Sequence, residues 1–260
     1  MSATCDCEAV AATLVAAARD AQAIAPISDS VEGLDVETAY VVQRIVVQDR
    51  LDAGERIVGA KLGLTSRAKQ QAMGVSFPSY GWLTSDMAAP TGEQLDLEPL
   101  IHPRAEPEVA FLLGSEVATP ATVQSVLAAT KAVFGAIEII DSRYEDFRFT
   151  LPDVIADNAS SARFLLGSVG LPPEDAGDLR LIGVVLRKDG EVMATAAGGA
   201  VMGHPAASVA WLVNQLAERG EKLPAGSIVL SGGLTAPVPV TRGSVVSAEF
   251  DGLGTVEVWA

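Results

Sequence analysis

The sequence has only two cysteines, few basic residues and no long apolar run, and each shortage excludes a class of protein. Cys5 and Cys7 lie close together near the start of the sequence, so they form no disulfide framework and favour a reduced, cytoplasmic protein. The 18 Lys and Arg oppose 33 Asp and Glu, and the net charge of −15 leaves no basic stripe for nucleic acid or an anionic membrane. No apolar run approaches the ~20 residues of a membrane span. Asp6 and Glu8 stand before the apolar stretch 9–18, where an export signal would carry basic residues.

Several catalytic signatures are missing as well. The sequence contains no GxGxxG, GxxxxGK[ST], GxSxG or HExxH motif, so dinucleotide, P-loop, α/β-hydrolase and zinc-peptidase chemistry lack their usual residues. Only two histidines occur, His102 and His204. An anionic substrate would therefore need a local cation, which either a metal ion or a few placed Lys and Arg side chains could supply.

The chain is long enough for one large domain or for a small and a larger one. It has 260 residues, of which 49% are hydrophobic, with 24 Gly and 14 Pro. We expect a helical N-terminal segment at residues 1–55 and a strand-rich catalytic body at residues 56–260. Helical spacing of apolar residues predicts helices at 8–24, 35–53, 122–133 and 205–220.

The body consists of short apolar runs separated by glycine and proline. Runs such as EVAFLLG, FGAIEIID and SIVLSGG are typical of strands, and Lys188-Asp189-Gly190-Glu191 between two of them predicts a hairpin. The strands do not alternate regularly with helices, which disfavours a doubly wound parallel sheet. We therefore predict an α+β fold with a mixed β-sheet body.

Three glutamates occur within these apolar strands. In HPRAEPEVAFLL, Glu106 and Glu108 are two residues apart, so they point to the same face of a strand. Glu138 lies between two isoleucines in FGAIEIID. Each glutamate alone could pair with an arginine or face water at a sheet edge. Together, in a chain with so few histidines, they favour oxygen ligation of a hard divalent cation such as Mg²⁺ or Mn²⁺.

Lys61 is the corresponding basic residue, placed in an apolar strand between Gly59 and Gly63. A lysine in this setting can extend its amine to the surface along an apolar stem. Close to a metal site, burial can instead lower its pKa so that it donates or accepts a proton. Both interpretations remain open from these residues alone.

Two polar segments could also contribute to a site. Residues 154–167 place Asp157, Asn158, Ser160 and Ser161 before an apolar strand, as a helix cap and turn or as donors for a carboxylate substrate. Residues 231–240 (SGGLTAPVPV) form either a strand connection or a backbone cradle.

Three long segments carry a resemblance to a known family. IHPRAEPEVAF, AIEIIDSRYEDFRFTLPDVIADNASSARFLLG and GHPAASVAWLVNQLAERGEKLPAGSIVLSGGLTAPVPV resemble the 2-keto-4-pentenoate hydratase/4-oxalocrotonate decarboxylase family of the fumarylacetoacetate hydrolase superfamily. The likeness runs from about residue 35 to the C-terminus. It implies an α+β body of layered, mixed β-sheets of the fumarylacetoacetate hydrolase type.

The resemblance also implies a set of site residues. It implies Mg²⁺ or Mn²⁺ held by Glu106, Glu108 and Glu138, and an active-site Lys61 on a segment that, with the helical N-terminal segment, helps to close over the substrate. We further expect substrate contacts from Leu62, Ser160, Ser161 and Thr235. Arg143 and Arg163 are candidates for binding the far carboxylate of a dicarboxylate.

Within the family, the sequence resembles decarboxylases more than hydratases. Hydratases usually have an Asp-Phe pair after the active-site lysine, where this sequence has Ser79-Tyr80. The implied reaction is metal-dependent decarboxylation of 2-oxo-3-hexenedioate to 2-hydroxypenta-2,4-dienoate and CO₂ in the catabolism of aromatic compounds. The resemblance further implies a homo-oligomer and a complex with the hydratase that takes the product.

Three other functions are alternatives to decarboxylation. A hydratase would use the same metal but add water. A hydrolase of carbon–carbon bonds would need a His-Glu pair on the N-terminal side of the site, yet no histidine precedes His102. A non-catalytic partner subunit would have no need for Lys61 together with the three glutamates.

Overall fold

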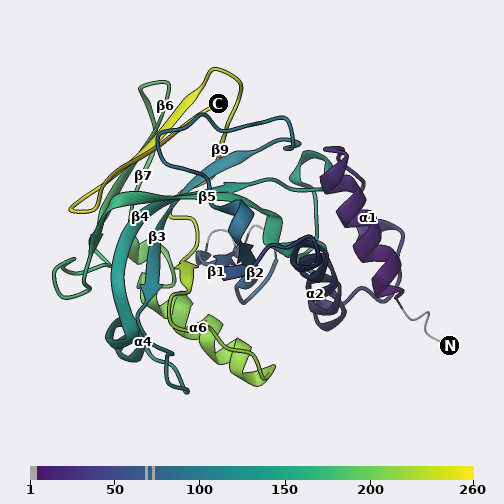
Figure 1. Cartoon of the computed structure of the whole chain (residues 1–260), viewed down its shortest axis with the longest axis horizontal. Coiled ribbons are helices and arrows are strands. Elements are labelled where there is room, and N and C mark those ends of the chain that lie inside the picture. Colours follow the sequence, from purple (N-terminus) through teal and green to yellow (C-terminus); the bar gives the residue numbers. More distant parts are fainter. Residues whose placement is uncertain (1–4, 68–69, 72–73) are drawn as a thin grey trace.

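Two packed β-sheets form the body of the molecule, and helices cover the central sheet (Figure 1). The computed structural model describes residues 5–67, 70–71 and 74–260. Within them, a seven-stranded sheet has the order β2-β1-β8-β3-β4-β5, with β9 paired to β3, and a four-stranded sheet has the order β11-β10-β6-β7. The first comprises β1 (Ile57–Gly63), β2 (Ser79–Thr84), β3 (Arg104–Leu113), β4 (Thr130–Ile140), β5 (Ser161–Leu171), β8 (Ile228–Leu230) and β9 (Val238–Pro239).

The central sheet is mixed, because β1 and β8 run parallel while its other pairs run antiparallel. The second sheet is antiparallel throughout, and its strands β10 and β11 pack on β4 and β5 of the first. It comprises β6 (Gly183–Lys188), β7 (Glu191–Ala197), β10 (Val245–Phe250) and β11 (Gly254–Trp259). This arrangement confirms the predicted α+β class with layered, mixed sheets.

The predicted hairpin at residues 188–191 is confirmed. Strands β6 and β7 pair antiparallel, and the turn between them uses Asp189 (φ 52°) and Gly190 (φ 85°). Two consecutive left-handed residues match the right-handed twist of the flanking strands, and Asp-Gly is a favoured pair for such a turn.

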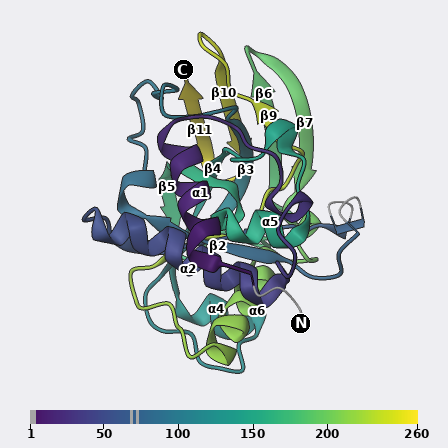
Figure 2. The same cartoon turned by 90° about the vertical axis from the view of Figure 1, so that its right-hand side faces the viewer.

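The N-terminal helices α1 (Cys7–Arg19) and α2 (Val36–Asp52) lie together on one side of the molecule (Figures 1 and 2). Asp6 and Asp35 cap them by accepting hydrogen bonds from the amides of Ala9 and Thr38. Helix α2 packs against α1, against β2 and against the short helix α5 (Leu151–Ala156). The predicted division at residue 55 stays a prediction.

The remaining elements are a longer helix and several short ones. Helix α6 (Pro205–Glu218) packs against α4 (Val123–Ala129) and β1. The 3₁₀ turns are Ile27–Asp29, Ser85–Met87, Glu145–Phe147, Asn158–Ser160 and Gly198–Ala200. Among the described residues, no helix has both the length and the apolar character needed to cross a membrane.

Two helix predictions were too long. The helix expected at 122–133 ends at Ala129, and Thr130–Val133 open strand β4, where Thr130 pairs with Leu113 and Val133 with Phe111. The helix expected at 8–24 ends at Arg19. Apolar residues at 126, 129 and 133 satisfy helical spacing, but β-branched residues also fit a sheet, and pairing with β3 decides the outcome.

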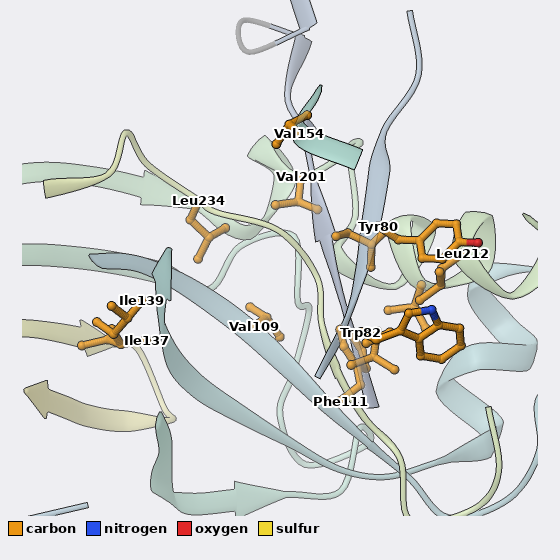
Figure 3. Close-up of a cluster of buried hydrophobic side chains, with 14 of the residues drawn as sticks. Tyr80, Trp82, Val109, Phe111, Ile137, Ile139, Val154, Val201, Leu212 and Leu234 are labelled. Carbon is orange, nitrogen blue, oxygen red and sulfur yellow. The ribbon is translucent and has the colours of Figure 1, made fainter. Parts of the chain in front are cut away.

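Most buried apolar side chains belong to one large cluster (Figure 3). It includes Val109 and Phe111 of β3 and Ile137 and Ile139 of β4, all fully buried. A second, smaller cluster contains Ala110, Ala136, Phe164 and Leu230. The two clusters occupy opposite faces of the same strands, because successive side chains of a strand alternate.

Candidate metal centre

The pairing of β3 with β4 brings the three glutamates together. Glu106 pairs directly with Glu138, and Glu108 lies two residues further along the same face of β3. One carboxylate oxygen from each of the three residues lies within 4.8 Å of the other two. The side chains are buried, with Glu108 0% and Glu138 1% exposed. Strand register therefore concentrates three acidic groups in a place that excludes water.

Lys61 reaches the same cluster from β1. Its position pairs with Leu230 of β8, and Leu230 pairs with Ala110 of β3, so Lys61 shares the face that carries the carboxylates. The amine Nζ lies 3.0 Å from Glu138 Oε1 and donates a hydrogen bond to the carbonyl of Ala159 at 2.9 Å. Lys61 is 3% exposed, so its amine lies in the site and does not extend to the surface.

Burial and mutual repulsion disfavour the charged forms of Glu108 and Glu138. Burial raises the pKa of Glu108 well above its ordinary value, and the neighbouring Glu138 raises it further. Burial also raises the pKa of Glu138, although the Lys61 ammonium opposes this shift. The backbone amide of Gly232 donates to Glu108 Oε2 at 2.6 Å. The Lys61 ammonium and the Gly232 amide each offset part of the cost of burying Glu138 and Glu108.

The donor set fits a hard divalent cation. Among the atoms that the structure describes, Glu108 Oε1 and Glu138 Oε2 are buried and accept no hydrogen bond. Buried acceptors of this kind cost free energy unless a ligand satisfies them. Three carboxylates without sulfur or imidazole are the donors that Mg²⁺ and Mn²⁺ prefer. The residues present therefore fit the metal implied by the sequence.

The four residues expected to contact the substrate differ in their surroundings. The Leu62 side chain is buried in the main core, on the face opposite Lys61. A substrate beside Lys61 could therefore contact only the backbone of Leu62. Ser160 Oγ donates to Asp157 Oδ2 at 3.3 Å, Ser161 Oγ to the Asn158 carbonyl at 2.8 Å, and Thr235 Oγ1 to the Ala236 carbonyl at 3.0 Å. Their contact with a substrate stays a prediction.

Arg143 and Arg163, the candidates for binding the far carboxylate of the substrate, each have a different environment. Arg143 pairs with the buried carboxylate of Asp157. Arg163 pairs with Ile139 in the ladder, next to the Glu138–Phe164 pair, so its side chain leaves the sheet on the opposite face from Glu138. It lines a cavity of about 370 Å³ beneath helices α1 and α2. Arg143 is thus occupied by Asp157, and Arg163 lies on the opposite face of the sheet from Glu138.

The backbone groups of the site were not identified from the sequence. The Gly232 amide that binds Glu108 lies in the segment considered as a backbone cradle, but nothing singled out this position. Gly232 has φ 108°, and a Cβ there would collide with the Thr65 side chain, so only glycine fits. The hydroxyls of Thr65, Ser79 and Ser231 are also buried and unpaired within the described part of the chain.

Comparison with known proteins identifies the family. The family described as fumarylacetoacetate (FAA) hydrolase C-terminal matches residues 56–258. A 4-oxalocrotonate decarboxylase of Pseudomonas sp. (strain CF600) is 44% identical over 91% of this chain and 90% of that protein. The chain belongs to the fumarylacetoacetate hydrolase family. The resemblance predicted from the sequence is thus confirmed.

Within the fumarylacetoacetate hydrolase family, the chain is similar to decarboxylases and to hydratases. A 2-keto-4-pentenoate hydratase of Paraburkholderia xenovorans (strain LB400) is 39% identical over 96% of this chain and 93% of that protein. The solved structure of 4-oxalocrotonate decarboxylase from Pseudomonas putida G7, complexed with magnesium and adipate, has a TM-score of 0.92 and 40% identity, covering 97% of this chain and 96% of that one. Fold and length agree over nearly the whole chain.

Proposed function

We propose that this protein is a divalent-metal-dependent decarboxylase that converts 2-oxo-3-hexenedioate (4-oxalocrotonate) to 2-hydroxypenta-2,4-dienoate and CO₂. The observation that carries the proposal is the buried cluster of Glu106, Glu108 and Glu138 with the Lys61 amine 3.0 Å from Glu138. The proposal is supported by 44% identity to a protein named 4-oxalocrotonate decarboxylase. It is also supported by a similar structure complexed with magnesium and the dicarboxylate adipate.

The reaction breaks the bond between the terminal carboxylate and the adjacent carbon. The electron pair of that bond passes along the conjugated chain to the 2-oxo oxygen, CO₂ leaves, and one proton completes the dienol. A divalent cation held by the three glutamates would supply positive charge beside the 2-oxo group, where negative charge collects during this step.

Lys61 is a side chain of this site that can donate to the same oxygen. Its ammonium has three N–H groups. The Ala159 carbonyl accepts one of them, and the ammonium also forms an ion pair with Glu138, which leaves donor capacity for the substrate. Because Lys61 and the carboxylates are buried, water screens their charges less than it would at the surface.

Ser79 favours decarboxylation over hydration. It pairs with Gly63 while Gly81 pairs with Lys61, so its side chain lies on the same face of the sheet as Lys61. Hydratases of the family usually carry an acid at this place, and an acid can activate water. The Ser79 hydroxyl is neutral, buried and without a hydrogen-bond partner in the described structure. It therefore supplies no general base for adding water.

The wider setting of the enzyme is part of the same proposal. We place it in the cytoplasm, as a homo-oligomer that associates with the hydratase consuming its product. Light scattering of the purified protein, alone and mixed with that hydratase, tests both associations.

The deciding experiment combines purified protein, 2-oxo-3-hexenedioate and Mg²⁺, and measures released CO₂ before and after chelation. We expect one CO₂ per substrate consumed and a loss of rate by several orders of magnitude without metal, because charge stabilisation by a metal contributes several kcal/mol. Absence of CO₂ release, with disappearance of 2-hydroxypenta-2,4-dienoate absorbance when that compound is supplied, would identify a hydratase instead.

A further inference from the structure

Three consecutive residues beside the candidate metal centre have a left-handed backbone. Asn158, Ala159 and Ser160 have φ angles of 48°, 53° and 57°, and none of them is glycine. Side chains at positive φ meet the backbone, so such residues usually occur singly. This left-handed turn (residues 158–160) connects α5 to β5, and the surrounding structure must hold it in place.

The left-handed turn supplies the carbonyl that binds Lys61. The Lys61 amine donates to the Ala159 carbonyl at 2.9 Å and lies 3.0 Å from Glu138 Oε1. One hydrogen bond to the Ala159 carbonyl together with the ion pair to Glu138 restricts the directions in which the other N–H groups of the ammonium can point. Without the Ala159 carbonyl, Glu138 alone would leave the amine free to rotate about that contact. The conformation of the turn therefore bears directly on the direction in which Lys61 donates.

The Asn158 side chain attaches the turn to β2. Its Oδ1 accepts from the Trp82 amide at 2.7 Å, and its Nδ2 donates to the Trp82 carbonyl at 2.9 Å. Because β2 lies at the end of the sheet, this amide continues the hydrogen-bond ladder where no further strand follows. Gly81, which pairs with Lys61, leaves room for the turn, since a Cβ there would collide with the Asn158 carbonyl.

A second set of contacts holds the ends of the turn. Arg143 pairs with the Asp157 carboxylate and donates from Nη2 to the Asp157 carbonyl at 2.6 Å. Ser161 Oγ donates to the Asn158 carbonyl at 2.8 Å. Arg143, Asp157 and Ser161 are all buried, so these bonds are protected from water. The turn is thus held on both sides, with the Ala159 carbonyl between the attachments.

We propose that Asn158 is a positioning residue, which sets the direction of the Lys61 ammonium by clamping the left-handed turn to the edge of β2. The proposal rests on the function proposed above, because the direction of the amine matters only if Lys61 donates to a substrate. The competing explanation is that Asn158 merely stabilises the connection between α5 and β5.

A matched pair of variants separates the two explanations. Asn214 of α6 makes the same two bonds elsewhere, accepting from the Ala121 amide at 2.7 Å and donating to the Ala121 carbonyl at 3.1 Å. Asn158→Ala and Asn214→Ala each lose two hydrogen bonds to the backbone of one residue, buried at Asn158 and part-buried at Asn214. We expect Asn158→Ala to lower kcat about a hundredfold with little change in KM, the scale expected for a misplaced catalytic group. Asn214→Ala should keep the wild-type kcat.

Asn158→Gly tests whether the backbone conformation of the turn alone is enough to position the Lys61 ammonium. Glycine adopts a positive φ readily but carries no amide to bind Trp82. We expect its kcat to fall as far as that of Asn158→Ala. A glycine variant with wild-type kcat would overturn the proposal, because the clamp would then be unnecessary.

The second measurement does not depend on turnover. In protein labelled with ¹⁵N-lysine, the Lys61 Nζ resonance is assigned by its disappearance in Lys61→Met. We expect it to shift or broaden in Asn158→Ala and to stay unchanged in Asn214→Ala. An unchanged resonance in Asn158→Ala, an unchanged kcat, or an equal loss of kcat in Asn214→Ala would each overturn the proposal. Wild-type protein without decarboxylation would overturn the proposed function only, since the resonance still reports whether Asn158 positions Lys61.

Discussion

The two faces of strands β3 and β4 are built on opposite principles. One face carries Glu106, Glu108 and Glu138, which are buried and mutually repelling. The other carries side chains such as Val109, Phe111, Ile137 and Ile139, which pack in the main core (Figure 3). Both sets alternate along the same backbone, and both are buried.

Because of this difference, the two faces of the same two strands should contribute separately to stability and to activity. Burial of an apolar side chain contributes roughly 1.5–3 kcal/mol, whereas burial of a charge costs free energy unless a partner offsets it. Lys61 offsets part of the cost on the acidic face, and a bound cation would offset more. We therefore expect the apolar face to stabilise the fold and the acidic face to determine the chemistry.

Glu108→Gln should have the largest effect. The amide keeps an oxygen for the Gly232 N–H but removes one charge from the cluster. We expect turnover to fall by about three orders of magnitude or more, since a metal ligand is lost. The free energy of unfolding of the metal-free protein should not decrease, because a buried, repelled carboxylate is removed. Steady-state CO₂ release and urea unfolding measure the two quantities, and a clear loss of stability would contradict the comparison.

Ile137→Ala tests the apolar face at the position next to Glu138. We expect the free energy of unfolding to fall by about 2–5 kcal/mol, because the deletion leaves a cavity in the core. The kcat of the folded protein, titrated for active sites, should stay within a few-fold of wild type. A large loss of kcat at full folding would show that the two faces are not independent.

The smallest expected effect is the change with pH in how much Mg²⁺ raises Tm. The raised pKa values of Glu108 and Glu138 mean that the folded, metal-free protein holds protons that the unfolded chain releases. The contribution of these two groups to its stability is therefore fully present below about 4.5, the ordinary glutamate pKa, and is lost as pH rises through the raised values.

Mg²⁺ should offset this loss, so we expect it to raise Tm by a few degrees at pH ~8 and by less at pH ~5. Differential scanning fluorimetry at both pH values makes the measurement, and Glu108→Gln should reduce the difference between them. An equal shift at both pH values in the wild-type protein would contradict the assignment of these carboxylates.

Short-range features were predictable from the residues, and long-range ones were not. The spacing of Glu106 and Glu108 placed them on one face, and Asp189-Gly190 predicted the hairpin that forms. Helical spacing extended the 122–133 prediction past Ala129, because pairing with β3 is invisible to a local pattern. A turn was one expectation for the segment that contains residues 158–160, but three consecutive left-handed residues without glycine were not predictable from it.

By itself, the sequence determined the kinds of element, the acidic chemistry of the site and the family, because these depend on residue types and on periods of two or 3.6 residues. Tertiary structure alone decided that Glu138 lies opposite Glu106, that Lys61 joins them from β1, and that Arg163 points away. The physical reason is strand register. A shift of one residue would reverse every side chain, and register is set by contacts between strands that are distant in the chain.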